Sequence, residues 1–200
     1  MPDPAPPVTL PNAEFIELKN ISSKAIDLKG WFIADAGSSA IIKESVMLYP
    51  DSLIILSSNT AAISLSAYGK AIGITNFPSL DNDGDLIKIL SPDGRVIHAV
   101  SYSVSWYKND LKKNGGWTLE MVDCRKPWEN SSNWMASVDS KGGTPGVKNS
   151  VDGQTEDLAA PQLIKAFTVD SIHVVLDFDE TLDSLDAVNN SNYFFTKLIK

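Results

Sequence analysis

Short runs of alternating apolar and polar residues, separated by clusters of turn-forming residues, most constrain what this chain can fold into. Residues 14–31 contain a short strand pattern, a polar turn and a second short strand pattern, so we expect a hairpin there. Ile16 and Leu18 share one face of the first strand and are the expected core face, whereas Phe15 and Glu17 face the other way. The same pattern recurs downstream and is typical of an antiparallel all-β domain.

Further strand patterns follow at regular intervals. Residues 45–58 hold two apolar runs split by a Pro-Asp pair, which predicts another hairpin-like unit. A strand at the end of 76–90 and a strand over 95–103 are joined by the turn residues 92–94, so we expect them to pair. Residues 60–70 show no clear period, and we expect them to be irregular.

The distribution of Pro and Gly predicts four parts. Residues 1–11 form a Pro-rich linker, 12–150 a β-sandwich, 151–160 a second linker and 161–200 a partial β domain. In the last part, strands are expected at 163–169, 172–178 and 193–198. About 40 residues are too few for an independent sandwich, so this part either packs on the first domain or belongs to a longer, truncated one.

Charge and cysteine content exclude several classes of function. The net charge of -8 opposes binding to nucleic acid or anionic lipid, unless Lys108, Lys112 and Lys113 form a local basic patch. A single cysteine, Cys124, excludes an intrachain disulfide and a zinc site built from several cysteines. No apolar run is long enough for a membrane-spanning helix.

An ordered series of motifs runs from residue 12 to about residue 150. The motifs are Glu14-Phe15-Ile16-Glu17-Leu18-Lys19-Asn20, Leu28-Lys29-Gly30-Trp31, Leu80-Asp81-Asn82-Asp83-Gly84-Asp85, Val100-Ser101-Tyr102-Ser103 with Trp106, Leu119-Glu120, Asn133-Trp134 and Gly143-Thr144-Pro145-Gly146 with Asn149. This series resembles the lamin tail domain in its bacterial form. The resemblance implies an immunoglobulin-like β-sandwich, found as an accessory module without an active site in exported multidomain bacterial proteins.

The second part, from residue 161, resembles the first half of a bacterial Ig-like domain and lacks that domain's later strands. Residues 1–11 have neither the basic start nor the apolar centre of a signal peptide. A Met directly before a Pro-rich linker suggests that an export signal was removed. Together with the resemblance, this predicts a secreted or cell-envelope location.

An acidic turn is the only candidate metal site. Asp81, Asp83 and Asp85 supply hard oxygen ligands of the kind Ca²⁺ prefers. The spacing is not that of an EF-hand, because Gly84 stands at the fourth place instead of the sixth and no Glu closes the loop. We therefore expect an acidic β-turn, with Ca²⁺ binding as the alternative and no other cofactor.

One segment also fits a catalytic motif. Residues 174–183 resemble the first motif of haloacid dehalogenase-type phosphatases, in which Asp177 would be the nucleophile and Asp179 the acid/base. Only 17 residues follow Asp183 in this sequence, which leaves no room for the parallel sheet and the lysine that such an enzyme needs. We interpret the match as a coincidence and expect no catalytic residues.

The segment 106–134 is rich in tryptophan. Its rings could stack on the apolar faces of a sugar, or they could anchor the core and loops. Because the lamin-tail resemblance assigns Trp106 and Trp134 to motif positions, Trp117 and Trp128 are the candidate ligand-binding residues. Exposed rings would favour a sugar binder, and buried rings a scaffold.

Histidine and glutamate positions give no sign of a catalytic site. His98 and His173 each lie in an expected strand without a second histidine nearby. Glu14 and Glu17 fall on opposite faces of one strand, which argues against a paired-carboxylate site. The sequence thus predicts a non-catalytic interaction or scaffolding module whose partner is a protein or a cell-surface polysaccharide. A carbohydrate-binding module is the alternative, and a hydrolase-associated domain is third.

Overall fold

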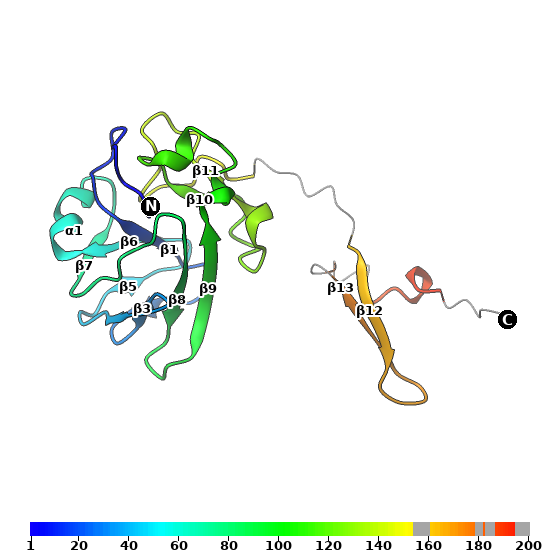
Figure 1. Cartoon of the computed structure of the whole chain (residues 1–200). Helices are drawn as coiled ribbons and strands as arrows, with labels where there is room; N and C mark the ends of the chain where they lie inside the picture. The colour runs from blue at the N-terminus through cyan, green and yellow to red at the C-terminus, as the bar shows by residue number, and fades with distance from the viewer. Residues whose placement is uncertain (154–160, 179–181, 183–186, 195–200) are drawn as a thin grey trace. The chain divides into compact units, whose positions relative to one another are not determined.

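The computed structural model describes residues 1–153, 161–178, 182 and 187–194. The chain divides into two compact units, Met1–Thr155 and Glu156–Lys200, and each is described by itself. Both are built from β-strands, with short helices between them (Figure 1). This confirms the expected all-β class.

The first half of unit Met1–Thr155 is one long antiparallel hairpin whose tip lies at Asp35–Ser38. Pairing begins with Phe15 opposite Ser57 and continues, with interruptions, to the tip. The expected 14–31 hairpin is therefore wrong, because its two strands lie on the same arm and pair with the other arm. The outgoing arm contains β1 (Phe15–Lys19), β2 (Ile26–Asp27) and β3 (Phe32–Ala34), and the return arm contains β4 (Ser39–Ile41), β5 (Met47–Leu48) and β6 (Leu53–Ser58).

The same finding corrects the hairpin-like unit expected over 45–58, since β5 and β6 do not pair with each other.

A buried asparagine, Asn20, holds the two arms together at the first interruption. The Asn20 backbone N–H donates to the Ser52 carbonyl (3.1 Å), and its side-chain amide donates to the carbonyls of Leu48 (2.9 Å) and Lys24 (2.8 Å). Asn20 thus satisfies carbonyls that no strand neighbour reaches.

Residues 60–70, expected to be irregular, contribute to a helical crossover. Helix α1 (Asn59–Leu65) is capped by Ser58, whose side chain accepts a hydrogen bond from the Ala61 N–H. The crossover delivers β7 (Ala71–Ile74) parallel to β6. Parallel neighbours need such a crossover because a tight turn cannot join them.

Strands β8 (Gly84–Leu90) and β9 (Val96–Ser103) pair antiparallel, as expected. They complete a four-stranded sheet in the order β4-β3-β8-β9, which leaves β9 at one edge. The register shifts by one residue between Ile89 and Leu90, so that Ile97 is an extra residue on β9. Such a bulge re-aims the side chains beside it.

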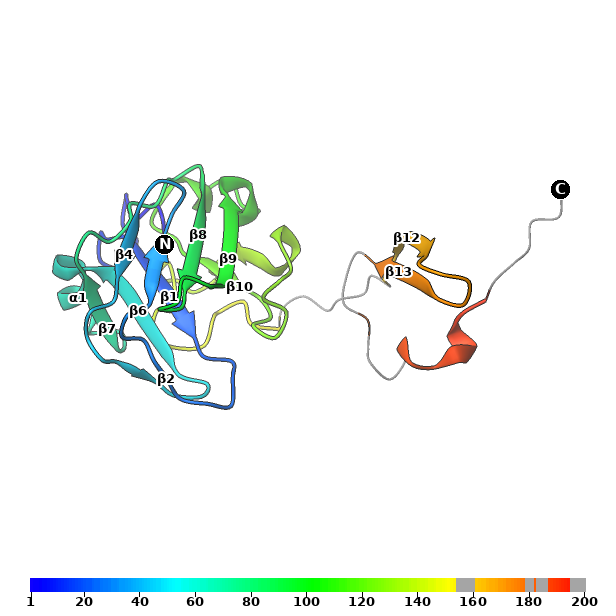
Figure 2. The same ribbon diagram turned by 90° about the horizontal axis from the view of Figure 1, so that it is seen from below.

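The core lies between this sheet and the three-stranded sheet β1-β6-β7 (Figure 2). Ile33 and Ala40 from one sheet meet Ile54, Leu56 and Ile74 from the other. Ile16 and Leu18 pack against this core, as the alternation predicts. The opposite face of β1 is also buried at Phe15, which the sequence did not indicate.

That second buried face is covered by the N-terminal segment and α1. Met1, Leu10 and Leu65 form a cluster with Phe15 and Ile55. Residues 1–11 therefore belong to the folded unit, and the expected linker is wrong. Phe15 alternates away from the main core and is buried in this second one.

The remainder of the first unit forms short elements that close one end of the sandwich. The first of them, η1, leads directly out of β9, and β10 pairs antiparallel with β11. These elements are η1 (Val104–Tyr107), η2 (Lys112–Asn114), β10 (Leu119–Met121), η3 (Ser131–Asn133) and β11 (Trp134–Ala136).

The second unit contains one antiparallel hairpin of β12 (Leu163–Thr168) and β13 (Val174–Phe178), followed by η4 (Asn190–Asn192). Two of its three expected strands are present, and most of the third, 193–198, lies outside the described residues. The resemblance of the part from residue 161 to an Ig-like domain stays a prediction. Within the described part of the chain, no helix has the length and apolar character needed to span a membrane.

Candidate functional site

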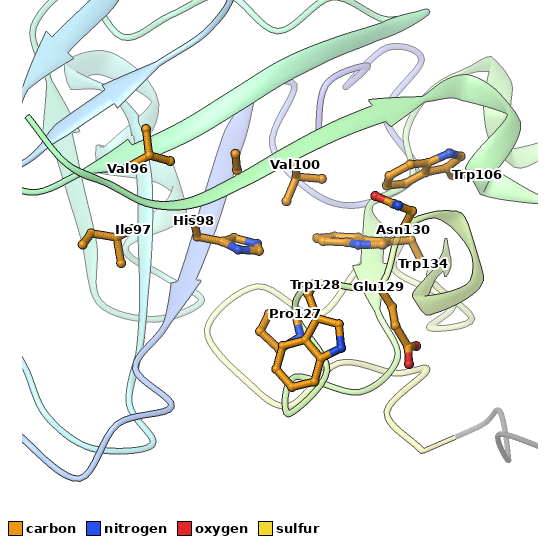
Figure 3. Close-up of a pocket in the computed structure, with 11 residues that line it drawn as sticks. Val96, Ile97, His98, Val100, Trp106, Pro127, Trp128, Glu129, Asn130 and Trp134 are labelled. Atoms are coloured by element: carbon orange, nitrogen blue, oxygen red, sulfur yellow. The ribbon is translucent and has the colours of Figure 1, made fainter. Parts of the chain in front are cut away.

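Strand β9 forms one wall of an aromatic groove (Figure 3). The bulge at Ile97 turns the side chains of Ile97 and His98 toward the same side of the strand, and Val100 follows along it. Ile97 keeps 46% of its surface exposed, whereas His98 and Val100 are half-buried. The irregular register therefore gives this wall both an apolar and a polar group.

Three tryptophans from three different elements form the other walls. Trp106 of η1 and Trp134 of β11 contact each other, with ring centroids 6.3 Å apart and planes tilted by 36°. Trp128 comes from the loop between β10 and η3 and is 56% exposed. Its ring stands beside Pro127 at the open side of the groove (Figure 3). The groove thus offers a rigid aromatic floor and one accessible ring.

The groove has a volume of about 270 Å³. This is just below the range of about 300–1,000 Å³ that is usual for small-molecule sites. It suits one or two side chains, or a single sugar, better than a large cofactor. The lining residues are Val96, Ile97, His98, Ala99, Val100, Trp106, Pro127, Trp128, Glu129, Asn130 and Trp134.

His98 carries an unsatisfied polar atom. Its Nε2 is buried and has no hydrogen-bond partner among the described residues. Burial lowers the pKa of His98 below its ordinary value, because the charged imidazolium would lose its hydration. The ring is therefore neutral at pH 7. Since buried polar atoms are nearly always paired, this nitrogen is the feature of the groove that most needs an explanation.

The side chain of Asn133, which is almost fully buried, holds the loop that bears Trp128 in place. The Asn133 amide donates to the carbonyls of Asp123 (2.9 Å) and Lys126 (2.8 Å), and its oxygen accepts from the Asp123 N–H (2.7 Å). An ion pair between Lys126 and Glu129 (3.4 Å) adds to this support. The groove is thus organised before any ligand arrives.

The two candidate tryptophans have different surroundings. Trp128 lies in the groove, as a binding residue should. Trp117 does not line it. The Lys112 ammonium sits 4.2 Å from the centre of the Trp117 ring, and the Trp117 carbonyl accepts a hydrogen bond from the Tyr107 hydroxyl (3.2 Å). Trp117 therefore contacts Lys112 and Tyr107 outside the groove, and the sequence did not distinguish it from Trp128.

The acidic turn is not assembled as a metal site. Among the described residues, no group of three or more His, Cys, Asp or Glu side chains is placed to hold a metal ion. Asp81 and Asp83 instead use their carbonyls, which accept hydrogen bonds from the Tyr102 hydroxyl (2.6 Å) and the Val104 N–H (2.9 Å). The turn thereby connects the start of β8 to the end of β9.

The phosphatase-like segment lies partly on β13. Asp177 is exposed on this strand, which pairs antiparallel with β12, and Asp179 lies outside the described residues. In the turn before β13, His173 Nδ1 is 2.7 Å from an Asp170 carboxylate oxygen. This pair is local and exposed, and its hydrogen bonds shape the turn.

The three lysines considered as a basic patch each have a protein partner. Lys108 and Lys112 donate to the carbonyls of Ser132 and Ser137, and Lys113 pairs with Asp110 (2.7 Å). The three ammonium groups therefore contact different parts of the fold and do not gather around one partner.

A buried carboxylate network that the sequence did not reveal lies elsewhere in the unit. Glu120 accepts hydrogen bonds from Thr118, Thr144 and Ser150. Glu17 accepts one from the Gly146 N–H (2.5 Å), and burial, with a smaller contribution from Glu120, raises the pKa of Glu17 to about 7. These carboxylates tie residues 144–150 to the sandwich. Glu120 is almost fully buried, and Glu17 is partly buried.

Comparison with known families supports the expected architecture. The family model of the Lamin Tail Domain matches residues 1–103, about half of the chain. It ends with β9, so the Trp-bearing walls of the groove follow the matched part. A search of curated proteins found no match. The family fold is immunoglobulin-like, which agrees with the antiparallel sandwich described above.

Proposed function

The chain belongs to the lamin tail domain family, and from this premise we propose that it is a non-catalytic interaction module that binds a partner protein in the aromatic groove. The unsatisfied Nε2 of His98 carries this proposal. A buried polar atom without a partner costs about 1–3 kcal/mol, and a ligand that hydrogen-bonds to it recovers that cost. The exposed ring of Trp128 provides an apolar anchor beside it.

The composition of the groove supports binding over catalysis. Its lining contains no Ser, Thr, Cys or Lys side chain, so the groove supplies no hydroxyl, thiol or amine nucleophile. Among the described residues, no group hydrogen-bonds to His98 Nε2 to make the ring a general base. Glu129, the one carboxylate in the lining, pairs with Lys126.

Site-directed photo-crosslinking tests the proposal. A photoreactive phenylalanine analogue replaces Trp128 in one variant and Ile63, an exposed apolar residue on α1 (77%), in the control. We expect a discrete protein adduct from position 128 and none from position 63 when the full chain is expressed in its native host. Equal adducts at both positions, or none at position 128, would overturn the proposal.

A carbohydrate ligand is the second candidate, favoured by the exposure of Trp128, because a flat ring can stack on a sugar face. Affinity electrophoresis in gels that contain soluble polysaccharides separates the two. If a sugar is the ligand, wild type and Trp117→Ala are retarded and Trp128→Ala is not. Unretarded migration of wild type in every gel would exclude this candidate.

The proposal includes an exported setting, as a module of a multidomain cell-envelope protein. It is supported by the resemblance to bacterial lamin tail domains and by the acidic surface (net charge -8). Fractionation of the native host, probed with an antibody against residues 12–150, tests this. Signal in the envelope or medium is expected, and signal confined to the cytoplasm would contradict it.

A further inference from the structure

The proposed function can be deepened, and the following rests on it. We propose that the partner binds as an extended protein segment that adds a strand to the free edge of β9 and inserts a bulky apolar side chain into the aromatic groove. Three observations support this occupant. They are the hydrogen-bonding phase of β9, the composition of its edge and the charge of the groove.

The phase of β9 determines which backbone groups face outward. The Val104 N–H donates to the Asp83 carbonyl (2.9 Å), directly beyond the pair formed by Gly84 and Ser103. Hydrogen-bonded and non-hydrogen-bonded pairs alternate along an antiparallel ladder. The backbone groups of Ala99 and Ser101 therefore point away from β8, toward the open edge. Both residues are exposed, and their backbone groups have no hydrogen-bond partner among the described residues.

This edge carries only one of the features that normally prevent pairing. Natural edge strands are short, are twisted by a β-bulge, or carry Lys, Pro or inward-pointing charges. Strand β9 is eight residues long, Val96–Ser103, and its sequence VIHAVSYS has no charged residue and no proline. Its bulge lies at Ile97, before the outward backbone groups of Ala99 and Ser101. At the other end of the sheet, β4 has only three residues. The part of β9 that follows the bulge is therefore the edge suited to receive a strand.

The groove adds specificity to this edge. Ala99 lines the groove and also carries an outward backbone group, so a strand paired there places its side chains next to Trp128. Alternate side chains of an added strand enter pockets while its backbone supplies affinity. The unpaired Nε2 of His98 fits a hydrogen-bonding side chain of the segment.

The charge of the groove narrows the class of partner. Glu129 is the one charged side chain in the lining, and it already pairs with Lys126 (3.4 Å). His98 is neutral. The lining therefore favours a bulky apolar side chain over a charged one. A sugar has no regular row of amides to pair with Ala99 and Ser101. The occupant inferred is thus an extended protein segment with an apolar anchor.

Selection from a random 12-residue peptide library displayed on phage, with chain 1–200 as the target, supplies a probe. We expect the enriched peptides to share a bulky apolar residue. In hydrogen exchange followed by NMR, bound peptide should slow the amides of Ala99 and Ser101 at least ten-fold. The amide of Leu53, at the start of β6 and remote in sequence, should not change.

Two matched substitutions separate backbone pairing from side-chain contact. Ala99→Pro removes an outward N–H without removing a bond to β8, and Ala99→Thr keeps that N–H. We expect Ala99→Pro to weaken peptide binding at least ten-fold and Ala99→Thr to change it less than three-fold. The exchange result on wild type decides the question even if Ala99→Pro fails to fold.

The possible outcomes distinguish a failure of strand addition from a failure of protein binding in the groove. If Trp128→Ala abolishes peptide binding while Ala99→Pro and the two amides are unaffected, the groove binds protein but strand addition is wrong. If no peptide is enriched, the inference is wrong, and crosslinking at position 128 still tests the proposed function. A dimer in sedimentation that Ala99→Pro dissociates would show that a second copy occupies the edge, and would also overturn the inference.

Discussion

Two buried polar groups of the same unit contrast sharply. The Glu120 carboxylate accepts hydrogen bonds from the side chains of Thr118, Thr144 and Ser150 and from the N–H groups of Thr144 and Ser150. His98 Nε2, by contrast, has no hydrogen-bond partner in the part of the chain that the structure describes. A satisfied group holds a fold together, whereas an unsatisfied one beside an open groove is available to a ligand.

The contrast extends to the residues around each group. Glu120 is surrounded by chain that it ties down, and only 5% of its surface is exposed. The groove at His98 is bordered by Trp128, which is mostly exposed and held only through its loop. We therefore expect substitutions at Glu120 to act on stability and substitutions at Trp128 to act on binding.

The largest effect is expected for Glu120→Ala. The substitution removes the carboxylate that accepts from the partly buried N–H groups of Thr144 and Ser150 and loosens residues 144–150 from the sandwich. Loss of a buried charged partner typically costs about 3–5 kcal/mol. Urea denaturation should show a decrease of this size in the free energy of unfolding. A loss below about 1 kcal/mol would mean that the network does not stabilise the fold.

A smaller effect is expected from the titration of Glu17. Burial raises its pKa to about 7, so the folded state holds a proton that the unfolded state releases near the ordinary value of 4.5. Stability is therefore full below pH 4.5 and falls as the pH rises to about 7, by on the order of 2–3 kcal/mol.

Glu17→Gln is the matched test of this pH dependence. The amide oxygen can still accept from the Gly146 N–H, whose residue has a positive φ of 80° that favours glycine. We expect the variant to lose most of the decline between pH 4.5 and 7 and to be more stable than wild type at pH 8. Parallel curves for the two proteins would contradict the pKa assignment.

Trp128→Ala should change stability by less than about 0.5 kcal/mol, since the ring is mostly exposed. Its effect should appear in binding, where loss of an aromatic anchor commonly costs 2 kcal/mol or more, roughly thirty-fold in Kd. Isothermal titration with a selected peptide measures the binding, and urea denaturation measures the stability. A destabilised variant with unchanged affinity would show that Trp128, like Glu120, acts on stability and not on binding.

The smallest effect concerns the titration of His98. Burial lowers its pKa, so the ring stays neutral to a lower pH than a solvent-exposed histidine does. Stability gained from this group is present above about pH 6.5 and is lost as the pH falls through the lower folded-state pKa. An NMR titration should place the His98 midpoint below the ordinary histidine value of 6.5. A midpoint at or above that value would contradict the buried environment of the ring.

The sequence predicted those features that depend on local pattern. Alternation and a three-residue turn identified the β8–β9 pair, and the ordered motifs identified the family. Pairing in the first half was wrong because a short turn after β1 suggested a local hairpin, whereas burial drives β1 against β6. The segment 60–70 likewise shows no clear period, because α1 buries only Leu65 fully and Ala61 in part.

The candidate site was predicted only in part, for a similar reason. Trp128 was singled out, but so was Trp117, and no local pattern separates a ring under Lys112 from a ring in a groove. The environment of Glu120 depends on Thr144 and Ser150, which are distant in sequence. The environment of His98 depends on how its ring is buried, which the sequence does not show. A one-residue bulge at Ile97 turns His98 into the groove, and a strand pattern with a period of two does not reveal it.

The indole N–H signals of the five tryptophans give the most direct test of the central claim, that the groove on β9 is the binding surface. The measurement is an NMR titration of the ¹⁵N-labelled chain with a peptide selected from the phage library. The account predicts that the signals of Trp106, Trp128 and Trp134 shift and that those of Trp31 and Trp117, which do not line the groove, stay in place. Shifts at Trp31 or Trp117 with an unchanged Trp128 would contradict it.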